Sequence, residues 1–448
     1  MFALMFSHLL SAIESKTATV AVIGLGYVGL PLVSVIHKSG FSCIGLDVDQ
    51  QKVDLLKEKK SYIHHIPHTL VSELMESGRF SPTTQFSDLK KAHVIIMCVP
   101  TPLSKYRDPD MSFVESTANS IGHHLQKGQL VILESTTYPG TCREVIQPIL
   151  ENLSGLKAGE DFFIAYSPER EDPGNASFST VKIPKVVGGL DEQSLKLATT
   201  LYDSFGIHTV PVSSLDTAEA VKLTENIFRS VNIALVNELK VVFDAMGIDV
   251  WEVIEAAKTK PFGFMPFYPG PGLGGHCIPI DPFYLTWKAR EFGLSTHFIE
   301  LAGEVNTSMP DYVVQKLRHA LDQRFQKSLK GSRVLIAGVA YKKNVDDARE
   351  SPAFVIMEKL QDMGVQLSYT DPFVPEIQPS REHPTLTGLK STPLTAEHLQ
   401  SVDAVLIVTD HDHVDYNLMA NHAPLIVDSR HAMGAIKDPK LRKKIVRA

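Results

Sequence analysis

The hydrophobic positions of this chain form short continuous runs that alternate with longer stretches of helical spacing. The first run begins at Thr19 and stops at a group of glycines, and a helical pattern follows it through Lys38. A second run, residues 43–47, comes at the distance typical of a β-α-β unit. Further candidates for buried strands lie downstream, at residues 94–99, 130–134, 162–166 and 185–187. This alternation predicts a doubly wound parallel sheet of the Rossmann type.

The pattern changes near residue 213. From Asp216 to Met246 apolar residues recur at helical spacing, without Pro or Gly until Gly247. Asp216 with Glu219 could cap the start of this helix, and Gly247 could cap its end. About thirty helical residues would form a rod of roughly 45 Å, and such rods often join domains or form dimer interfaces. We therefore expect a long central helix in a helical middle domain, and a homodimer or higher homo-oligomer.

A second α/β pattern begins at Arg333 and has strand candidates at 365–369, 404–408 and 425–427. It contains no G-x-G-x-x-G, so we expect no second dinucleotide there. The sequence thus predicts an α/β protein with two Rossmann-like, doubly wound parallel-sheet domains, joined by the long helix and a helical middle domain. The expected domains are residues 1–212, 213–325 and 326–448. Residues 1–16 lack the basic start and cleavage site of a secretory signal and fit a short amphipathic helix.

The bulk properties exclude several classes of protein. No run approaches the roughly 18 apolar residues of a membrane span, so we expect no membrane association. A net charge of −7 argues against a nucleic-acid partner. The four cysteines include no C-x-x-C pair, which favours the reducing cytoplasm. The histidines show no spacing typical of metal ligands, so no metal is predicted.

A dinucleotide site is indicated by Gly24, Gly26 and Gly29, which form G-x-G-x-x-G between a strand and a helix. Without side chains the backbone can turn tightly there and present helix N-terminal amides to a pyrophosphate. Asp47 ends the next strand, where its carboxylate would accept hydrogen bonds from a ribose diol and repel a 2′-phosphate. NAD is therefore favoured over NADP, although glycines that only serve turns and an FAD site are alternatives. The expected cofactor site also includes Tyr27, Val28 and Thr101.

Residues 266–282 are so rich in Gly and Pro that they predict an irregular loop, and this loop carries Cys277. A thiol could attack an aldehyde or hold an acyl group, but only its thiolate is strongly nucleophilic, so a nearby cation is needed. Lys222 and Asn226 share one face of the long helix and could converge on a reacting oxygen. An inert buried cysteine and a solvated helix face are the alternatives. His276 is not favoured as a partner, because adjacent side chains in an extended segment point apart.

Six motifs, in order over nearly the whole chain, resemble the UDP-glucose/GDP-mannose dehydrogenase family. They are GLGYVG at 24–29, ESTTYPG at 134–140, YSPEREDPG at 166–174, KLTEN at 222–226, GGHCIPID at 274–281 and YKKNVDDARESP at 341–352. The Tyr-Ser-Pro-Glu-Arg form and the loop before Cys277 are most similar to the branch that acts on UDP-N-acetylhexosamines. The resemblance implies that UDP-N-acetyl-D-glucosamine is the substrate, residues 1–212 bind NAD and residues 326–448 bind the UDP-sugar.

The resemblance also implies the reaction, which is two successive hydride transfers from the sugar C6 to two NAD molecules. Cys277 would add to the aldehyde, and water would hydrolyse the thioester that the second oxidation produces. By the same resemblance, Lys222 and Asn226 stabilise the developing oxyanion, and Asp281 activates the water. The threonine and the glutamate of the family's motifs correspond to Thr137 and Glu169. An ion pair between Glu169 and Arg170, and a plain turn role for Thr137, are the alternatives.

For the last domain, the resemblance places Lys342 and Arg430 near the UDP-sugar and Arg349 near the cofactor pyrophosphate, as a cationic cleft for diphosphates requires. An exposed mixed-charge stretch is the alternative for residues 342–350. The region before the Gly-Pro loop departs from UDP-glucose enzymes, which carry an arginine there, and Lys260 could replace it. The full set of expected substrate-binding residues is Glu169, Arg170, Lys222, Asn226, Lys260, Gly274, Lys342 and Arg430.

Other functions stay open at this point. The sugar could be UDP-glucose or UDP-N-acetylmannosamine. Recognition of the orientation of one sugar hydroxyl depends on small displacements of polar groups in the site, which the sequence does not reveal. A β-hydroxyacid or 6-phosphogluconate type of dehydrogenase would also join a Rossmann domain to a long helix, but it would perform one oxidation without a thiol intermediate. A non-catalytic sensor of nucleotide sugars is a rival from another class. The resemblance suggests that the product enters polysaccharide synthesis.

Overall fold

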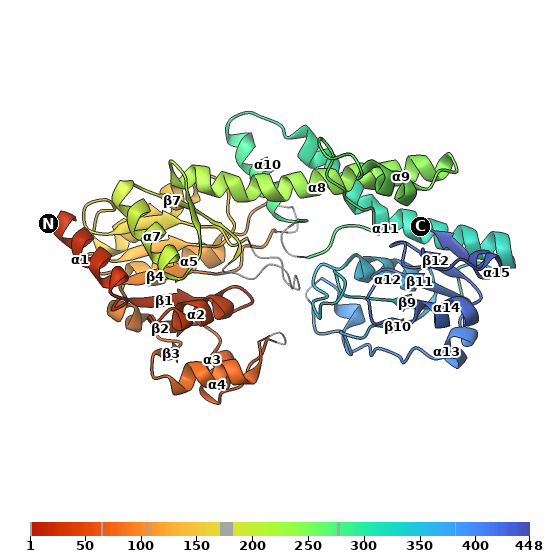
Figure 1. Cartoon of the computed structure of the whole chain (residues 1–448), viewed down its shortest axis with the longest axis horizontal. Helices are drawn as coiled ribbons and strands as arrows, with labels where there is room; N and C mark the ends of the chain where they lie inside the picture. The colour runs from red at the N-terminus through yellow and green to blue at the C-terminus, as the bar shows by residue number, and fades with distance from the viewer. Residues whose placement is uncertain (1, 64–65, 105–107, 171–181, 276–277, 381) are drawn as a thin grey trace. The chain divides into compact units, whose positions relative to one another are not determined.

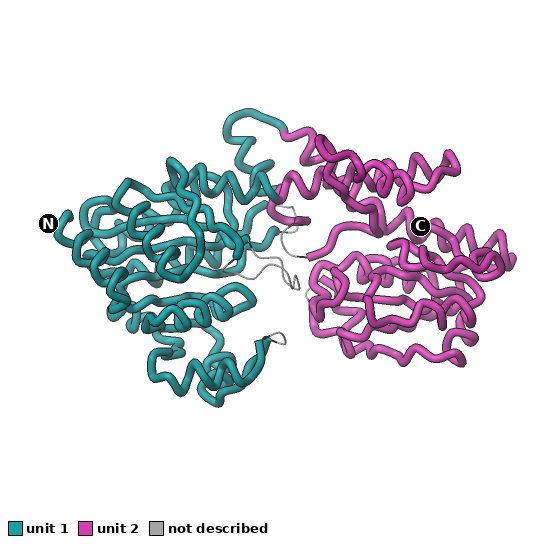
Figure 2. The backbone as a smooth tube through the Cα atoms, viewed as in Figure 1, with its two compact units in different colours: residues 1–225, 283–295 teal, residues 226–282, 296–448 magenta. Residues whose placement is uncertain are grey.

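The structure is a computed structural model that describes residues 2–63, 66–104, 108–170, 182–275, 278–380 and 382–448. It forms two compact units (Figure 2). Unit 1 comprises residues 1–225 and 283–295, and unit 2 comprises residues 226–282 and 296–448. Cys277 and His276 lie outside the described residues. The division into three domains stays a prediction.

Unit 1 contains an eight-stranded sheet in the order β3-β2-β1-β4-β5-β6-β7-β8, in which all neighbours are parallel except β6 and β7. The strands are β1 (Thr19–Ile23), β2 (Ser42–Leu46), β3 (Phe80–Thr83), β4 (Val94–Met97), β5 (Leu130–Leu133), β6 (Phe163–Tyr166), β7 (Lys185–Gly189) and β8 (Thr209–Pro211). The apolar runs form the buried inner strands, as predicted, because a parallel sheet covered on both faces buries both sides of each strand. The sequence did not predict β3 and β8.

Helices cover both faces of this sheet (Figure 1). They are α1 (Phe2–Glu14), α2 (Gly29–Lys38), α3 (Gln50–Lys57), α4 (His68–Glu76), α5 (Ser112–Gly122), α6 (Gln147–Ser154) and α7 (Glu192–Ser204), with shorter helical turns η1 (Phe86–Lys91) and η2 (Cys142–Ile146). The predicted amphipathic helix at the N-terminus is confirmed as α1, which buries Leu9 and Ile13. Its Phe2 ring stacks on Phe163 of β6, with 4.7 Å between the ring centroids.

The predicted long helix is α8 (Leu215–Ala245), which begins in unit 1 and continues into unit 2 (Figure 1). Gly247, two residues after the last residue of α8, adopts a φ of +72° and ends the helix, as predicted. The predicted cap by Asp216 and Glu219 is wrong, because the Ser214 hydroxyl accepts the Thr217 amide at 3.1 Å instead. The other helices of this central region are α9 (Val250–Ala257), α10 (Asp281–Glu291) and α11 (His297–Phe325).

Unit 2 contains the second sheet, whose five strands are all parallel in the order β10-β9-β11-β12-β13. They are β9 (Arg333–Ala337), β10 (Gln366–Thr370), β11 (Ala404–Ile407), β12 (Ile426–Asp428) and β13 (Ile445–Arg447). The helices are α12 (Pro352–Asp362), α13 (Ala396–Ser401), α14 (Tyr416–His422), α15 (Pro439–Arg442) and the short η4 (Pro384–Leu386). The second Rossmann-like domain is thereby confirmed, with β13 as an unpredicted edge strand.

Candidate functional site

The glycine motif forms the turn between β1 and α2. Gly24 has a φ of +91°, and a Cβ there would stand 2.3 Å from the carbonyl oxygen of Cys98. A Cβ on Gly29 would stand 1.8 Å from the carbonyl oxygen of Gly24. At Gly26, by contrast, a Cβ would meet nothing within 4 Å. The backbone packing therefore requires the first and third glycines, and the second leaves open space beside the start of α2, as a pyrophosphate site needs.

Asp47 lies at the end of β2 and orders this turn. Its carboxylate accepts the Leu25 amide at 2.9 Å and the Asp49 amide at 3.0 Å, and the Lys52 ammonium lies 3.2 Å away. The Asp47 side chain is only 6% exposed. Tyr27 is exposed within the turn, and Val28 is half-buried. The Asp47 carboxylate therefore orders the backbone of the glycine turn through these hydrogen bonds.

Thr137 supplies a buried polar group at the same sheet edge, in the segment that follows β5. Its side chain is fully buried, and its hydroxyl has no hydrogen-bond partner among the described residues. Thr101 follows β4 and is half-buried. Parallel strands bring the segments after β1, β4 and β5 to one edge, which is where such sheets bind ligands. The open space at Gly26 and the unpaired Thr137 hydroxyl fit a bound dinucleotide.

Glu219 of α8 holds the segment after β5, a role that the sequence did not reveal. Its carboxylate accepts the Gly140 amide at 2.6 Å and the Cys142 amide at 2.9 Å. Burial raises the pKa of Glu219 to about 7, although these hydrogen bonds oppose the shift. Gly140 adopts a φ of +101°, which glycine tolerates. The helix that carries Lys222 is therefore fastened to the segment that carries Thr137.

Lys222 is buried and not part of a solvated helix face. Its ammonium donates to the carbonyl oxygen of Glu169 at 2.5 Å and lies 4.0 Å from the Glu169 carboxylate. Arg170 makes a two-pronged contact with Glu225, at 2.5 and 3.2 Å. Both pairs join α8 to the segment after β6.

A small cavity of about 30 Å³ lies beside these pairs in unit 1. Val28 of the glycine turn, Glu169 and Arg170 all contribute to its lining. Its wall also contains Glu134, which is held by Lys185 at 3.1 Å and by the Tyr202 hydroxyl at 2.5 Å. The structure thus brings a predicted cofactor residue next to two predicted substrate residues.

In unit 2, Asn226 and Asp281 form a buried pair. The Asn226 amide nitrogen donates to the Asp281 carboxylate at 2.5 Å, and the two residues are 5% and 3% exposed. Asp281 begins α10, four residues after Cys277. Lys222 and Asn226 are four residues apart on α8 and share a face, as predicted. An amide and a buried carboxylate in contact can together hold a water or a substrate oxygen.

The Gly-Pro loop before Cys277 is irregular, as predicted, and packs on the second sheet's domain. A Cβ on Gly270 would stand 2.4 Å from the Arg430 guanidinium, and one on Gly274 would stand 2.9 Å from the Tyr341 side chain. Asn237 of α8, which the sequence did not single out, accepts the Gly270 amide at 2.9 Å. The missing side chains let the loop approach Arg430 and residue 341 closely.

The remaining predicted cations of unit 2 have different surroundings. The Arg430 Nε donates to the Val408 carbonyl at 2.9 Å, and Lys342 is half-buried. Arg349 is 47% exposed and forms an ion pair with Asp347 at 2.6 Å. Lys260 is exposed after α9, with its ammonium 5.1 Å from the centre of the Phe262 ring. Arg430 therefore contacts the loop. These contacts of Lys260 and Arg349 do not by themselves indicate a binding role.

Two further findings concern the described residues as a whole. They contain no group of three or more His, Cys, Asp or Glu side chains placed to hold a metal ion. They also contain no helix both long enough and apolar enough to cross a membrane.

Comparison with known proteins identifies the family. Three domain models of the UDP-glucose/GDP-mannose dehydrogenase family match: the NAD binding domain at residues 18–206, the central domain at 216–308 and the UDP binding domain at 335–435. The UDP-N-acetyl-D-glucosamine 6-dehydrogenase of Pseudomonas aeruginosa is 37% identical, over 94% of this chain and 97% of the relative.

A second relative, the UDP-N-acetyl-D-mannosamine dehydrogenase of Pyrococcus horikoshii, is 37% identical over 88% of this chain and 89% of its own. A solved structure of a UDP-D-ManNAc dehydrogenase from the same organism matches with a TM-score of 0.83, at 33% identity over 94% of this chain and 96% of that one. The chain therefore belongs to the UDP-glucose/GDP-mannose dehydrogenase family and is an NAD-dependent oxidoreductase of the UDP-sugar dehydrogenase type.

Proposed function

We propose that this enzyme oxidises the C6 alcohol of a UDP-N-acetylhexosamine to a carboxylate, through a covalent intermediate on Cys277. UDP-N-acetyl-D-glucosamine is the preferred candidate, which would make the chain a UDP-N-acetyl-D-glucosamine 6-dehydrogenase. The observation that carries the proposal is the buried hydrogen bond between Asn226 and Asp281, four residues from Cys277. The two relatives named above act on N-acetylated hexosamines, which supports this sugar class over glucose.

The first part of the reaction needs donors for a developing oxyanion. NAD, held by the glycine turn, would supply the hydride acceptor for both oxidations. The Cys277 sulfur bonds to the aldehyde carbon, and the resulting thiohemiacetal again carries a hydrogen that can leave as hydride. Lys222 and Asn226 donate hydrogen bonds to the sugar oxygen, and preorganised donors of this kind contribute a few kcal/mol each. The buried position of Lys222 limits competition from water.

Hydrolysis of the thioester needs a base for water. Asp281 is the candidate, because its carboxylate is buried and is oriented by the Asn226 amide. The water gives its proton to Asp281 as its oxygen bonds to the acyl carbon, and the Cys277 thiolate leaves. A positioned carboxylate base typically contributes about a hundredfold in rate. Glu169 holds the Lys222 ammonium in place, and Thr137 supplies a hydroxyl near the cofactor.

The binding residues are proposed as follows. Gly24, Gly26, Gly29, Asp47 and Thr101 hold NAD, together with Arg349 at its pyrophosphate. Lys342 and Arg430 bind the UDP-sugar from the last of three domains, whose proposed boundaries are those of the sequence prediction. Their charge suits a diphosphate, and Arg430 contacts the loop that leads to Cys277. Lys260 and Arg170 are further candidates for the sugar.

A stoichiometric assay tests the proposal. The amount of NADH released per molecule of sugar is measured with UDP-N-acetylglucosamine, its galactosamine and mannosamine epimers, and UDP-glucose. We expect about two NADH per UDP-N-acetylglucosamine and no full turnover in Cys277→Ala. Cys43→Ala, at a cysteine buried in β2, is the matched control and should keep the ratio. One NADH per sugar with full activity in Cys277→Ala would refute the mechanism, and activity only with UDP-glucose would refute the substrate.

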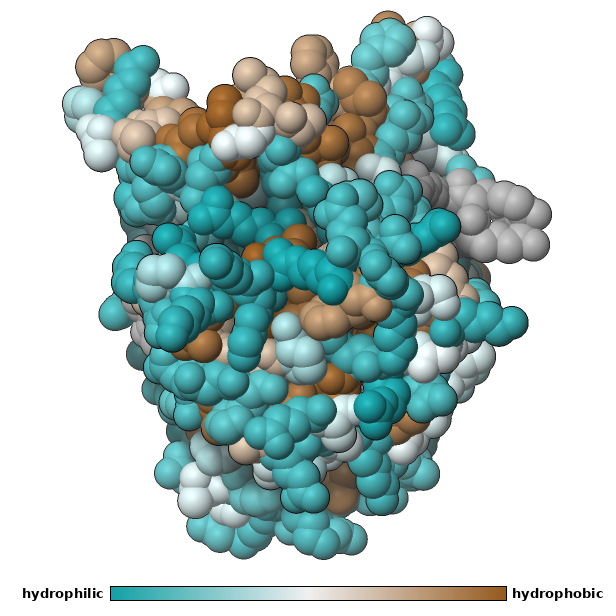
Figure 3. All heavy atoms as spheres, turned by 90° about the vertical axis from the view of Figure 1, so that its right-hand side faces the viewer, coloured by the Kyte–Doolittle hydropathy of each residue, from teal (hydrophilic) through white to brown (hydrophobic). Residues whose placement is uncertain are grey.

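We also propose that the enzyme works in the cytoplasm as a homodimer or a higher homo-oligomer. Figure 3 shows hydrophobic side chains gathered along the upper edge of one face, where Figure 1 places the end of α8 and α9. Exposed apolar residues here include Val241 and Val242 of α8, Met246 after it and Val253 of α9. A second copy would cover this surface, and light scattering coupled to gel filtration should give at least twice the monomer mass. A monomer would contradict this.

A further inference from the structure

Unit 2 contains a second cavity, of about 220 Å³, that is not part of the site described above. It lies where α8 ends and α9 begins, and α11 and β13 complete its wall. The polar and aromatic residues of its lining are Lys240, Asp244, Asp249, Trp251, Tyr312 and Arg447. A water molecule occupies roughly 30 Å³, so the cavity has room for a ligand larger than a single water.

Lys240 is the unusual member of this lining. It is only 4% exposed, and its ammonium makes no hydrogen bond to any described residue. It lies over the face of the Tyr312 ring, 5.7 Å from the ring centre. Burial lowers the pKa of Lys240 to about 7, with a smaller contribution from the positive charge of Arg430. A buried ammonium without an acceptor is costly, so the missing acceptor needs an explanation.

The carboxylates of the cavity do not supply that acceptor. Asp244 forms an ion pair with Lys316, and Asp249 forms one with Arg447 at 2.7 Å. The charged groups that act on Lys240 are therefore the cations Arg430 and Lys316 and the carboxylates Asp428 and Asp244. Each carboxylate of the lining already has a cation, and among the described residues no carboxylate accepts a hydrogen bond from the Lys240 ammonium.

We propose that this cavity binds a small anion, whose carboxylate or phosphate oxygen accepts hydrogen bonds from the Lys240 ammonium. The anion supplies the missing acceptor and offsets the cost of burying the charge. Arg447 also lines the cavity, but it is already paired with Asp249, so Lys240 is the donor on which the proposal depends. No covalent step is involved.

The site is connected to the Gly-Pro loop by a stack of aromatic rings. Trp251 lines the cavity, and its ring stacks on His431 at 5.1 Å and on Tyr268 at 5.7 Å between centroids. His431 follows Arg430, which packs against Gly270 of the loop. An anion that holds Trp251 in place therefore stabilises residues 266–275, and the cavity can act as an effector site for that loop.

Thermal unfolding of the full chain tests the binding. Sodium phosphate replaces sodium chloride at constant ionic strength and pH 7, and we expect the Tm of the wild type to rise by about 2–4 °C. Lys240→Met keeps the length of the side chain and removes its donors, so its Tm should rise clearly less than that of the wild type. Lys330→Met, at an exposed lysine of the same unit, should respond like the wild type. An equal rise in Lys240→Met, or none in the wild type, would overturn the proposal.

A second measurement needs only the wild type, in case Lys240→Met does not fold. Sulfate, which has no proton to exchange near pH 8, is titrated calorimetrically in buffers of different ionisation enthalpy. Because the anion favours the charged form of Lys240, binding should be accompanied by a measurable uptake of protons, of less than one proton per bound anion. Amide exchange should also slow at residues 266–275 when sulfate is present. Binding without proton uptake, or absence of binding at millimolar sulfate, would contradict the assignment of Lys240 as the anion's partner.

Discussion

The turns after β1 and β9 are built alike in the two Rossmann-like sheets. Gly24 and Gly338 each follow the first strand of their sheet and have φ values of +91° and +83°. A Cβ at either position would stand 2.3 Å from a carbonyl oxygen, that of Cys98 after β4 or that of Thr409 after β11. The first glycine of the turn is therefore a requirement of the fold itself, and it carries no information about the ligand.

The two turns differ at their second and third positions. Gly26 and Gly29 correspond to Ala340 and Lys343 in the second turn. Gly26 leaves open space and Gly29 packs on Gly24, so only the first turn keeps a bare backbone that a pyrophosphate can approach. Lys343 forms an ion pair with Asp412 at 2.8 Å, which fastens the second turn to the segment that follows β11. The proposed dinucleotide site therefore depends most on the open backbone at Gly26, which the second turn lacks.

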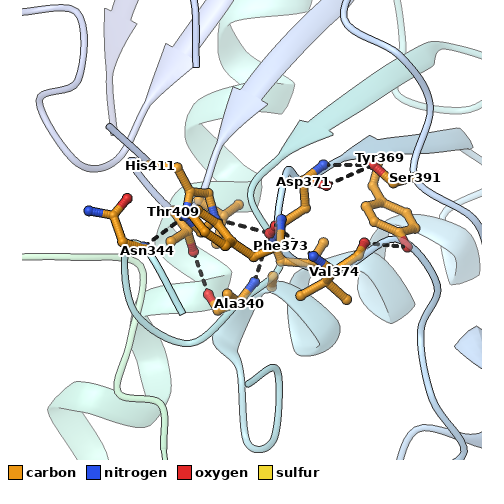
Figure 4. A network of polar contacts seen from close by, with 12 residues as sticks. Ala340, Asn344, Tyr369, Asp371, Phe373, Val374, Ser391, Thr409 and His411 are labelled. Carbon is orange, nitrogen blue, oxygen red and sulfur yellow. Dashed lines mark hydrogen bonds and ion pairs between the residues drawn. The ribbon is translucent and has the colours of Figure 1, made fainter. Parts of the chain in front are cut away.

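The aspartates that follow β2 and β10, Asp47 and Asp371, differ in how many hydrogen bonds they accept from the protein. Figure 4 shows Asp371, which follows β10, at the centre of a polar network. It accepts four backbone amides at 2.7–3.1 Å and the His411 ring nitrogen at 3.0 Å. Burial acts to raise the pKa of Asp371, but His411 and these amides hold it below its ordinary value. Among the described residues Asp47 accepts two backbone amides, so Asp371 has the larger share in holding its own domain together.

The largest predicted effect separates these two aspartates. Asp371→Ala should cost about 3–5 kcal/mol of unfolding free energy, because it leaves His411 and several amides buried without an acceptor. Asp47→Ala should cost about 1–2 kcal/mol. Urea unfolding is followed by fluorescence in Trp287→Phe, where Trp251 reports unit 2, and in Trp251→Phe, where Trp287 reports unit 1. If Asp371→Ala and Asp47→Ala lowered the unfolding free energy of their units equally, the proposed difference between the two aspartates would be wrong.

A second prediction compares the two α8 side chains that hydrogen-bond to a backbone segment of each unit, Glu219 in unit 1 and Asn237 in unit 2. Glu219 anchors residues 140–142 and has a pKa of about 7, whereas the neutral Asn237 anchors Gly270. Between about pH 4.5 and 7 the folded Glu219 keeps a proton that the unfolded chain has lost, so raising the pH favours unfolding. Unit 1 should lose roughly 1–3 kcal/mol over this range.

The control for this contrast is Glu219→Gln, which cannot titrate and should show a flatter stability profile between pH 4.5 and 7. Asn237→Asp is the converse change and should introduce a pH dependence into unit 2. Urea unfolding at several pH values measures both. A wild-type unit 1 whose stability rises with pH over this range would show that Glu219 is ionised throughout.

The smallest predicted effect concerns Gly26. A Cβ at this position meets no protein atom, so Gly26→Ala should leave the stability of unit 1 unchanged. It should nevertheless fill part of the space for the pyrophosphate and weaken NAD binding about tenfold, or by about 1.4 kcal/mol. Gly24→Ala, which clashes with the Cys98 carbonyl, should instead destabilise the unit. Unchanged NAD affinity in Gly26→Ala would place the cofactor elsewhere.

The inner strands, α1 and α8 could be predicted because each has a strong local pattern. The missed strands β3, β8 and β13 all lie at sheet edges, where half-exposed residues carry a weak pattern. Pro82 in β3 also obscured its strand character, although an edge strand tolerates proline. Edge strands are defined by their neighbours more than by their own residues.

The site shows the same limit. Lys222, Asn226, Asp281 and the glycine turn could be found from motifs, because their spacing along the chain is fixed. Glu219 and Asn237 could not, since their partners Gly140 and Gly270 lie 79 and 33 residues away. Lone polar residues in a helix do not reveal which distant backbone amide they bind. Cys277 is predicted by its motif but lies outside the described residues, so its role stays a proposal.

The most direct test of the central claim titrates NAD and UDP separately into wild type, Gly26→Ala and Arg430→Ala. Gly26→Ala should lose about tenfold in NAD affinity, because its Cβ would enter the space proposed for the pyrophosphate, and should bind UDP normally. Arg430→Ala should lose about tenfold or more in UDP affinity and keep NAD binding. If Gly26→Ala binds NAD normally, or Arg430→Ala loses NAD and keeps UDP, the assignment of one nucleotide to each sheet is wrong.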